Sequence, residues 1–208
     1  KMQNINMDSH VMMKFLHMML RGRTMNYVSI TKDDVCNGNG LRVVLWVSGC
    51  EHHCQSCQNP QTWDYNGGIE FDQSAKEEIF NQLKLPYIEG ITLSGGDPLA
   101  AENVSEVYKI VDEIRLSFPS KTIWLYTGYT LEQLYSPISG QLAHAAYKNE
   151  NDVYKLRQKV ISACDVVVDG EYIDELRDVT LHWRGSSNQR VIDVKKTFEK
   201  GEVVLWSS

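Results

Sequence analysis

The sequence has no apolar run long enough to cross a bilayer and no excess of basic residues. Its 208 residues hold 21 Lys and Arg against 27 Asp and Glu, a net charge of −6, whereas nucleic-acid binding requires clustered positive charge. The nearest approach to a membrane segment, Val11–Leu20, is interrupted by Lys14 and His17. It falls short of the ~18 residues of a span and is followed by no small-residue cleavage site. We therefore expect a cytoplasmic protein that binds neither nucleic acid nor membrane.

Cysteine is also scarce, and its distribution does not suit a disulfide framework. Of the five cysteines, three lie within eight residues, at Cys50, Cys54 and Cys57. In a reducing compartment such clusters are more often metal ligands or redox groups than disulfides. Cys36, in a turn, and Cys164, at the start of an apolar run, are interpreted as ordinary residues.

The first 24 residues differ in composition from the rest, because six of the seven methionines lie at or before Met19. We interpret residues 1–24 as a leader or extension ahead of a start at Met25, with a short amphipathic helix at Val11–Leu20 as the alternative. Residues 25–208 are long enough for one domain with a sizeable core.

From residue 25 onward, strand-like and helix-like patterns alternate. Apolar runs predict strands at 40–47, 91–93, 122–126 and 165–168. Helical spacing predicts helices at 73–84, 102–118 and 151–163. This alternation indicates an α/β protein with a parallel sheet covered by helices. Ligand sites in such folds collect at the carboxyl ends of strands, so the segments that follow the first two strands, Ser48–Pro60 and Ser94–Pro98, should face one pocket.

The cysteine spacing is C-x3-C-x2-C, which provides three thiols and no fourth. A structural zinc site needs four protein ligands, and either His52 or His53 would be cramped as the fourth, so both are interpreted as polar loop residues. A [4Fe–4S] cluster held by three cysteines keeps one iron without a protein thiolate, and that iron can take a small chelating ligand. Both readings remain open on spacing alone.

The cysteine spacing after a strand resembles that of radical S-adenosylmethionine enzymes, in which the methionyl group of the cofactor chelates the open iron. The SGGDP of Ser94–Pro98 resembles the segment that receives the methionyl amino group in those enzymes. Gly95 and Gly96 lack a Cβ and so allow close approach of backbone to ligand, while Asp97 can accept a hydrogen bond from an ammonium. The resemblance implies an incomplete, open parallel β/α barrel, since the chain is shorter than the ~250 residues of a full barrel.

A wider resemblance points to a narrower family. The segments NGNGLRVVLWVSGC, CQNPQTWDYNGG, GITLSGGDPL, IWLYTGYTLEQL, VVVDGEY and HWRGSSNQRVID are similar to the activating component of anaerobic (class III) ribonucleotide reductase. This resemblance implies that an electron, from a donor such as flavodoxin, enters the cluster and cleaves S-adenosylmethionine. The resulting 5′-deoxyadenosyl radical then removes a hydrogen atom from a glycine Cα in the reductase's large subunit. Two alternatives remain: a radical enzyme acting on a small molecule, such as one forming the deazapurine ring of a modified tRNA base, and a non-enzymatic zinc module.

The resemblance also assigns site residues, and it assigns no general base. The expected cluster ligands are Cys50, Cys54 and Cys57. The expected cofactor-binding residues are Ser56, Gln58, Gly95, Gly96, Asp97, Thr127 and Asp169. Ser56 stands where many radical S-adenosylmethionine enzymes have an aromatic residue, but a small residue is usual in the reductase activases. Tyr126 stands where a related activase has Asp, so no cation site is expected there.

Overall fold

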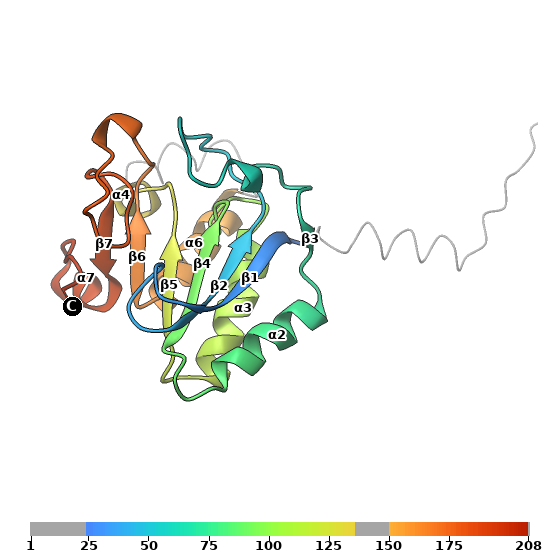
Figure 1. The fold of residues 1–208 in the computed structure, drawn as a ribbon. Coiled ribbons are helices and arrows are strands. Elements are labelled where there is room, and N and C mark those ends of the chain that lie inside the picture. The colour runs from blue at the N-terminus through green and yellow to red at the C-terminus, as the bar shows by residue number, and fades with distance from the viewer. Residues whose placement is uncertain (1–23, 136–149, 208) are drawn as a thin grey trace, which may run out of the picture.

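Seven strands form one mixed sheet within the part of the chain that the computed structural model describes, residues 24–135 and 150–207 (Figure 1). The order across the sheet is β3-β1-β2-β4-β5-β6-β7. The bounds of the strands are β1 Asn26–Asp34, β2 Arg42–Val47, β3 Ile69–Glu70, β4 Gly90–Gly95, β5 Thr122–Tyr126, β6 Val166–Asp169 and β7 Arg190–Asp193. The segment interpreted as a leader, apart from its last residue, lies outside the described residues, and so does the alternative helix at Val11–Leu20.

The helices connect the strands and complete the element order. Their bounds are α2 Gln73–Leu83, α3 Val104–Ser117, α4 Leu131–Tyr135, α6 Glu150–Ala163 and α7 Val194–Lys200, with 3-10 turns at Pro60–Thr62 and Asp174–Leu176. The three helices predicted from the sequence correspond to α2, α3 and α6, and the four predicted strands correspond to β2, β4, β5 and β6. The α/β prediction is therefore confirmed for the centre of the molecule.

The prediction of a wholly parallel sheet is wrong at both edges. Strands β2, β4, β5 and β6 run parallel, but β1 pairs antiparallel with β2 and β3, and β7 pairs antiparallel with β6. The connection from β1 to β2, residues 35–41, is too short for the crossover that a parallel pair requires. The segment 170–189 begins at the carboxyl end of β6 and enters β7 from that same end. Strand β1 also precedes β2, the first of the strands predicted from the sequence.

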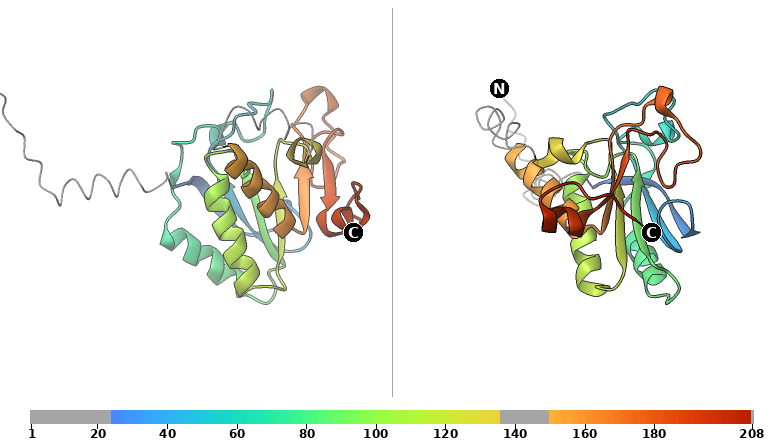
Figure 2. Two further views of the ribbon diagram at one scale, coloured as in Figure 1. Left: turned by 180° about the vertical axis from the view of Figure 1, so that it is seen from behind. Right: turned by 90° about the vertical axis from the view of Figure 1, so that its left-hand side faces the viewer.

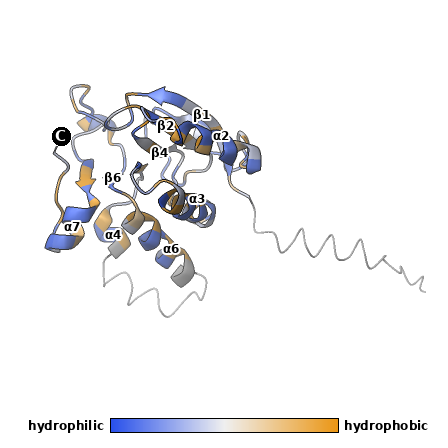
Figure 3. Ribbon diagram, turned by 90° about the horizontal axis from the view of Figure 1, so that it is seen from below, coloured by the Kyte–Doolittle hydropathy of each residue, from blue (hydrophilic) through white to orange (hydrophobic). Residues whose placement is uncertain are grey.

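The main core lies between the sheet and its helices. Helices α3 and α6 pack together behind the sheet (Figure 2) and lie on one side of β4 and β6 when seen from below (Figure 3). Alternate strand residues such as Val43, Leu45 and Leu93 belong to this core together with the α3 residues Val107 and Ile110, and all of them are buried. The apolar stripe of α3 is therefore the face that the helical spacing predicted.

The opposite face of the sheet holds a second cluster built on aromatic rings. Trp124 packs edge-on against Trp183 and Trp206, with ring centroids 5.1 and 5.7 Å away. The guanidinium of Arg42 lies 5.4 Å from the Trp124 ring and is fully buried. Burial lowers the pKa of Arg42 to about 10, and hydrogen bonds to three backbone carbonyls and two threonine hydroxyls satisfy its donors.

Among the described residues, no helix has the length and apolar content needed to cross a membrane.

Candidate functional site

The segment that we call the cysteine loop, residues 48–57, leaves the carboxyl end of β2. It is held to the following 3-10 turn by two backbone hydrogen bonds, from Gly49 N to Thr62 O (2.7 Å) and from Cys50 N to Trp63 O (3.1 Å). Gly49 has φ +100°, and a Cβ at this position would lie 1.9 Å from the Tyr65 ring. Glycine is therefore required where the chain turns out of the sheet.

The three cysteines lie half-buried along this loop, and each sulfur is approached by backbone N–H groups. Those of His52 and His53 approach the Cys50 sulfur, and that of Tyr172 approaches the Cys54 sulfur. The Asn59 N–H lies 3.4 Å from the Cys57 sulfur. Hydrogen bonds to the sulfurs are a feature of protein iron–sulfur sites.

Burial raises the pKa of two of these thiols, those of Cys50 and Cys54. It raises the pKa of the Cys50 thiol to about 11, although the N–H groups of His52 and His53 lower it, and it raises the pKa of the Cys54 thiol as well. Only thiolates ligate iron. A bound metal cation would favour the charged form of the Cys50 and Cys54 sulfurs.

The donor set fits a cluster with three protein ligands. Within residues 24–135 and 150–207, no three His, Cys, Asp or Glu side chains converge on a single metal ion. A [4Fe–4S] cluster does not require such convergence, because each cysteine binds a different iron atom. Three spaced thiols with N–H donors are what such a cluster needs from the chain.

The segment that we call the GGDP loop, residues 95–98, begins at the last residue of β4 and lies directly beside the cysteine loop. Asp97 N donates to Gly49 O at 2.8 Å. A Cβ on Gly96 would lie 2.3 Å from that same Gly49 oxygen, and one on Gly95 would lie 2.8 Å from Val47 O. The space that these glycines leave is filled by the backbone of β2 and the cysteine loop, and a role of Gly95 and Gly96 in binding the cofactor stays a prediction.

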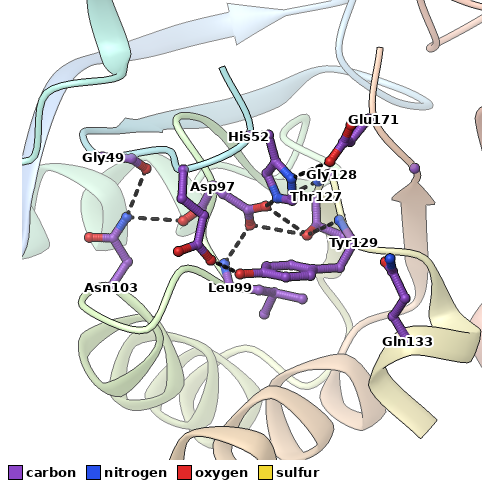
Figure 4. Close-up of polar contacts among 12 residues, drawn as sticks. Gly49, His52, Asp97, Leu99, Asn103, Thr127, Gly128, Tyr129, Gln133 and Glu171 are labelled. Carbon is purple, nitrogen blue, oxygen red and sulfur yellow. Dashed lines mark hydrogen bonds and ion pairs between the residues drawn. The ribbon is translucent and has the colours of Figure 1, made fainter. Parts of the chain in front are cut away.

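Asn103, which the sequence analysis missed, joins the two loops (Figure 4). Its buried side-chain amide donates to Ser48 O (2.9 Å), Gly49 O (3.3 Å) and Asp97 O (3.0 Å). Asn103 precedes α3, so this amide fixes the start of that helix to both loops. From sequence, an Asn at the start of a helix indicates an N-cap. No local pattern distinguishes that role from the joining of two loops.

The Asp97 carboxylate is 2% exposed and accepts hydrogen bonds from several segments. Its donors are Leu99 N at 2.8 Å, the Thr127 hydroxyl and Gly128 N at 3.0 Å, and His52 Nε2 at 2.7 Å. The Thr127 hydroxyl, another expected cofactor contact, is therefore directed at Asp97. A role of either residue in binding the cofactor stays a prediction, whereas the organisation of the loops by Asp97 is observed.

Two expected cofactor residues, Ser56 at the end of the cysteine loop and Gln58 just after it, lie beside the segment that follows β6. The Ser56 hydroxyl donates to Asp174 at 3.1 Å, and Gln58 is exposed, with its Nε2 3.5 Å from where a Cβ on Gly185 would be. Ser56 has φ +56°. These contacts place segment 170–189 over the second half of the cysteine loop.

Asp169, the remaining expected cofactor residue, is buried at the end of β6. Its carboxylate accepts from Leu131 N at 2.8 Å and from the Arg190 guanidinium. Arg190 also pairs with Glu132 and lowers the pKa of Glu132 to about 2, mainly through that hydrogen bond. These side chains line a pocket of about 470 Å³ at the ends of β5 and β6, together with Gly128.

The structure therefore brings Cys50, Gly95, Gly96, Asp97 and Thr127 to neighbouring strand ends, as the topology predicted. Asp169 lies at the end of the next strand. Figure 4 shows that the side chains of Asp97 and Thr127 meet between the cysteine loop and the segment after β5.

Comparison with known proteins identifies the kind of protein that this arrangement represents. Residues 36–192 match the family described as a 4Fe-4S single cluster domain. The fold and the cysteine loop thus belong to a single-cluster iron–sulfur domain.

Similar proteins narrow this class. The anaerobic ribonucleoside-triphosphate reductase-activating protein of Escherichia coli strain K12 is 40% identical over 169 residues, which are 80% of this chain and 97% of that protein. The proteins of the same name from Haemophilus influenzae and Enterobacteria phage T4 are each 38% identical over 167 residues. These cover 79% and 80% of this chain, and 96% and 93% of those proteins. The chain belongs to the family of anaerobic ribonucleoside-triphosphate reductase-activating proteins, which confirms the resemblance found in the sequence.

Proposed function

We propose that this protein activates an anaerobic ribonucleoside-triphosphate reductase by generating a glycyl radical on the large subunit of that enzyme. The proposal needs a [4Fe–4S] cluster, S-adenosylmethionine and an electron donor such as flavodoxin. When bound, these groups would supply the chemistry: one electron from the donor and one hydrogen atom from a glycine Cα would convert S-adenosylmethionine into methionine and 5′-deoxyadenosine, and the glycine would be left as a radical. A cytoplasmic location is part of the same proposal.

In this proposal the chain's own residues hold the cluster and orient the cofactor. Cys50, Cys54 and Cys57 hold the cluster as thiolates, and the missing fourth ligand leaves one iron for the methionyl group. Asp97 and Thr127 lie just beyond the ends of β4 and β5, the two strands that follow β2 across the sheet, where they order the surface that the cofactor meets. No side chain is assigned as acid or base, because the reaction moves a hydrogen atom and an electron.

The observation that carries the proposal is the direct attachment of the GGDP loop to the cysteine loop. The bond from Asp97 N to Gly49 O and the three contacts of Asn103 join the two motifs at adjacent parallel strand ends. A cluster on the cysteines and a ligand of its open iron would both be met by this one joined surface. Family membership supports the same function independently.

We further infer that the four parallel strands with their helices are the remnant of an open β/α barrel. The second face of the sheet, with Trp124 and Arg42, would be its interior, and the sheet edges would leave it open at the side. An open side suits a substrate that is a loop of another protein.

The test is anaerobic reconstitution with iron and sulfide, followed by electron paramagnetic resonance of the reduced protein with and without S-adenosylmethionine. We expect a signal that shifts when the cofactor is added, and no cluster in Cys54→Ala. Cys36→Ala is the matched control, because Cys36 is exposed and outside the loop.

A second assay adds the reductase, a reductant and S-adenosylmethionine, and measures the glycyl radical signal and 5′-deoxyadenosine together. Formation of 5′-deoxyadenosine without any reductase-dependent radical would instead favour a small-molecule substrate. Binding of one equivalent of zinc with no uptake of iron or sulfide would refute the radical function.

A further inference from the structure

The two adjacent histidines of the cysteine loop have different environments. His53 is exposed, its ring centroid lies 4.9 Å from that of Trp63, and its side chain makes a hydrogen-bond contact with Glu51 O, 3.2 Å away. The His52 side chain is 9% exposed. The interpretation of both histidines as polar loop residues is therefore incomplete for His52.

Both ring nitrogens of His52 are engaged by carboxylates. Nε2 lies 2.7 Å from Oδ2 of Asp97, and Nδ1 lies 2.9 Å from Oε1 of Glu171. Neither nitrogen is therefore available to ligate a metal, which removes His52 as a fourth ligand. We call the contact chain Asp97, His52 and Glu171 the imidazole bridge (Figure 4).

The imidazole occupies a space formed for it. A Cβ on Gly128 would lie 2.5 Å from His52 Cδ2, and the Tyr129 ring packs edge-on at 4.7 Å. On the acceptor side, Leu99 N and Gly128 N already fix the Asp97 carboxylate. The partner that His52 meets is therefore preorganised by the ends of β4 and β5.

The position of the bridge relates it to the cysteines. His52 stands between Cys50 and Cys54, and its ring reaches across the ends of β4 and β5 to Glu171, after β6. Glu171 is followed directly by Tyr172, whose backbone N–H approaches the Cys54 sulfur. One side chain thus connects the middle of the C-x3-C segment to the other loops around the cluster.

We propose that His52 is a positioning residue that fixes the cysteine loop against the GGDP loop and segment 170–189 before the cluster is inserted. The effect of His52 on the cluster and on cofactor binding rests on the proposed function. Two of the loop residues, His53 and Ser56, have positive φ, a conformation that costs free energy for residues other than glycine. The bridge supplies contacts that hold the loop in that conformation.

The test compares His52→Ala, His52→Gln and the matched control His53→Ala in two states. In the apo-protein, hydrogen exchange is measured at the backbone amides of Gly49 and Cys50, which donate hydrogen bonds to Thr62 O and Trp63 O. We expect exchange about tenfold faster in His52→Ala, since a charge-assisted hydrogen bond to a buried carboxylate is lost. His53→Ala should match the wild type, and His52→Gln, which keeps one donor for Asp97, should lie between.

In the reconstituted protein, the readouts are the g-values of the reduced cluster and the dissociation constant of S-adenosylmethionine. We expect His52→Ala to alter the cofactor-induced shift and to weaken cofactor binding about tenfold, with partial rescue in His52→Gln. A variant that lowers only the melting temperature, with unchanged loop exchange and g-values, would show a merely structural role and overturn the proposal.

The two proposals fail separately. If the wild type takes up no cluster, the proposed function is lost, but exchange in the apo-protein still decides whether the bridge orders the loop. If His52→Ala does not fold, Glu171→Gln replaces it, because that substitution weakens only the exposed end of the bridge. Exchange at Gly49 and Cys50 that is identical in Glu171→Gln and wild type would then overturn the proposal.

Discussion

The attachment of the two loops by Asn103 can be tested by Asn103→Ala. The side-chain amide carries two hydrogens and contacts three carbonyl oxygens, so it makes two good hydrogen bonds, to Ser48 O and Asp97 O, and one shared contact to Gly49 O. Each net bond contributes about 1 kcal/mol, and a buried carbonyl left without a donor costs ~1–3 kcal/mol. The substitution should therefore lower the free energy of unfolding by about 2–4 kcal/mol.

The assay is urea unfolding of the apo-protein under anaerobic conditions, followed by circular dichroism. Ser105→Ala, two residues later on the exposed side of α3, is the matched control and should stay within about 0.5 kcal/mol of the wild type. A loss below about 0.5 kcal/mol in Asn103→Ala would refute the reasoning, because it would mean that water replaces the amide and that the loops do not depend on it.

Three further predictions follow from the geometry. Arg42→Ala should lower the free energy of unfolding by about 3–5 kcal/mol, because it leaves buried oxygen acceptors without a hydrogen-bond donor and removes the contact with Trp124. A change below about 1 kcal/mol in urea unfolding would contradict this. Gly96→Ala should abolish the cofactor-induced change in the cluster signal, because its Cβ would lie 2.3 Å from Gly49 O, whereas Gly201→Ala, which meets no atom within 4 Å, should cost only about 1 kcal/mol of backbone strain and leave the signal unchanged. The pKa of Glu132 is lowered from 4.5 to about 2 by Arg190, so its contribution to stability is present above about pH 4.5 and is lost as the pH falls toward 2; unfolding measured across this range should depend less on pH in Glu132→Gln, and an unchanged dependence would show that the pair contributes nothing.

The centre of the fold could be predicted because its pattern is local. Continuous apolar runs specified β2, β4, β5 and β6, and the spacing along α3 specified its buried face. Strand β1 was missed because its sequence, NYVSITKDD, mixes charged and apolar residues, as suits a strand whose burial is uneven. Strand β7 has four residues, and its antiparallel direction depends on the path of segment 170–189, which no local pattern encodes.

The site was predictable to the level of its motifs and no further. The cysteine spacing and SGGDP marked two loops, and the alternation of strands and helices placed them at one edge of the sheet. The separate roles of His52 and His53 could not be predicted from the sequence, because the hydrogen-bond partners of His52 lie 45 and 119 residues away in the chain. A pair of identical neighbours gives no local signal of which one is buried.

The two carboxylates expected to contact the cofactor show why an acid at a strand end is ambiguous in sequence. Asp97 accepts from the N–H groups of Leu99 and Gly128, and Asp169 accepts from the N–H of Leu131. In both cases the carboxylate satisfies backbone donors of a segment that would otherwise end unpaired at the edge of the sheet. A ligand site in this fold requires that edge to be ordered first, so the same residue type at the same position serves the loops and, through them, the ligand. Binding of S-adenosylmethionine would therefore depend on these acids even if neither touches it, and contact can be separated from organisation only by a readout on the apo-protein.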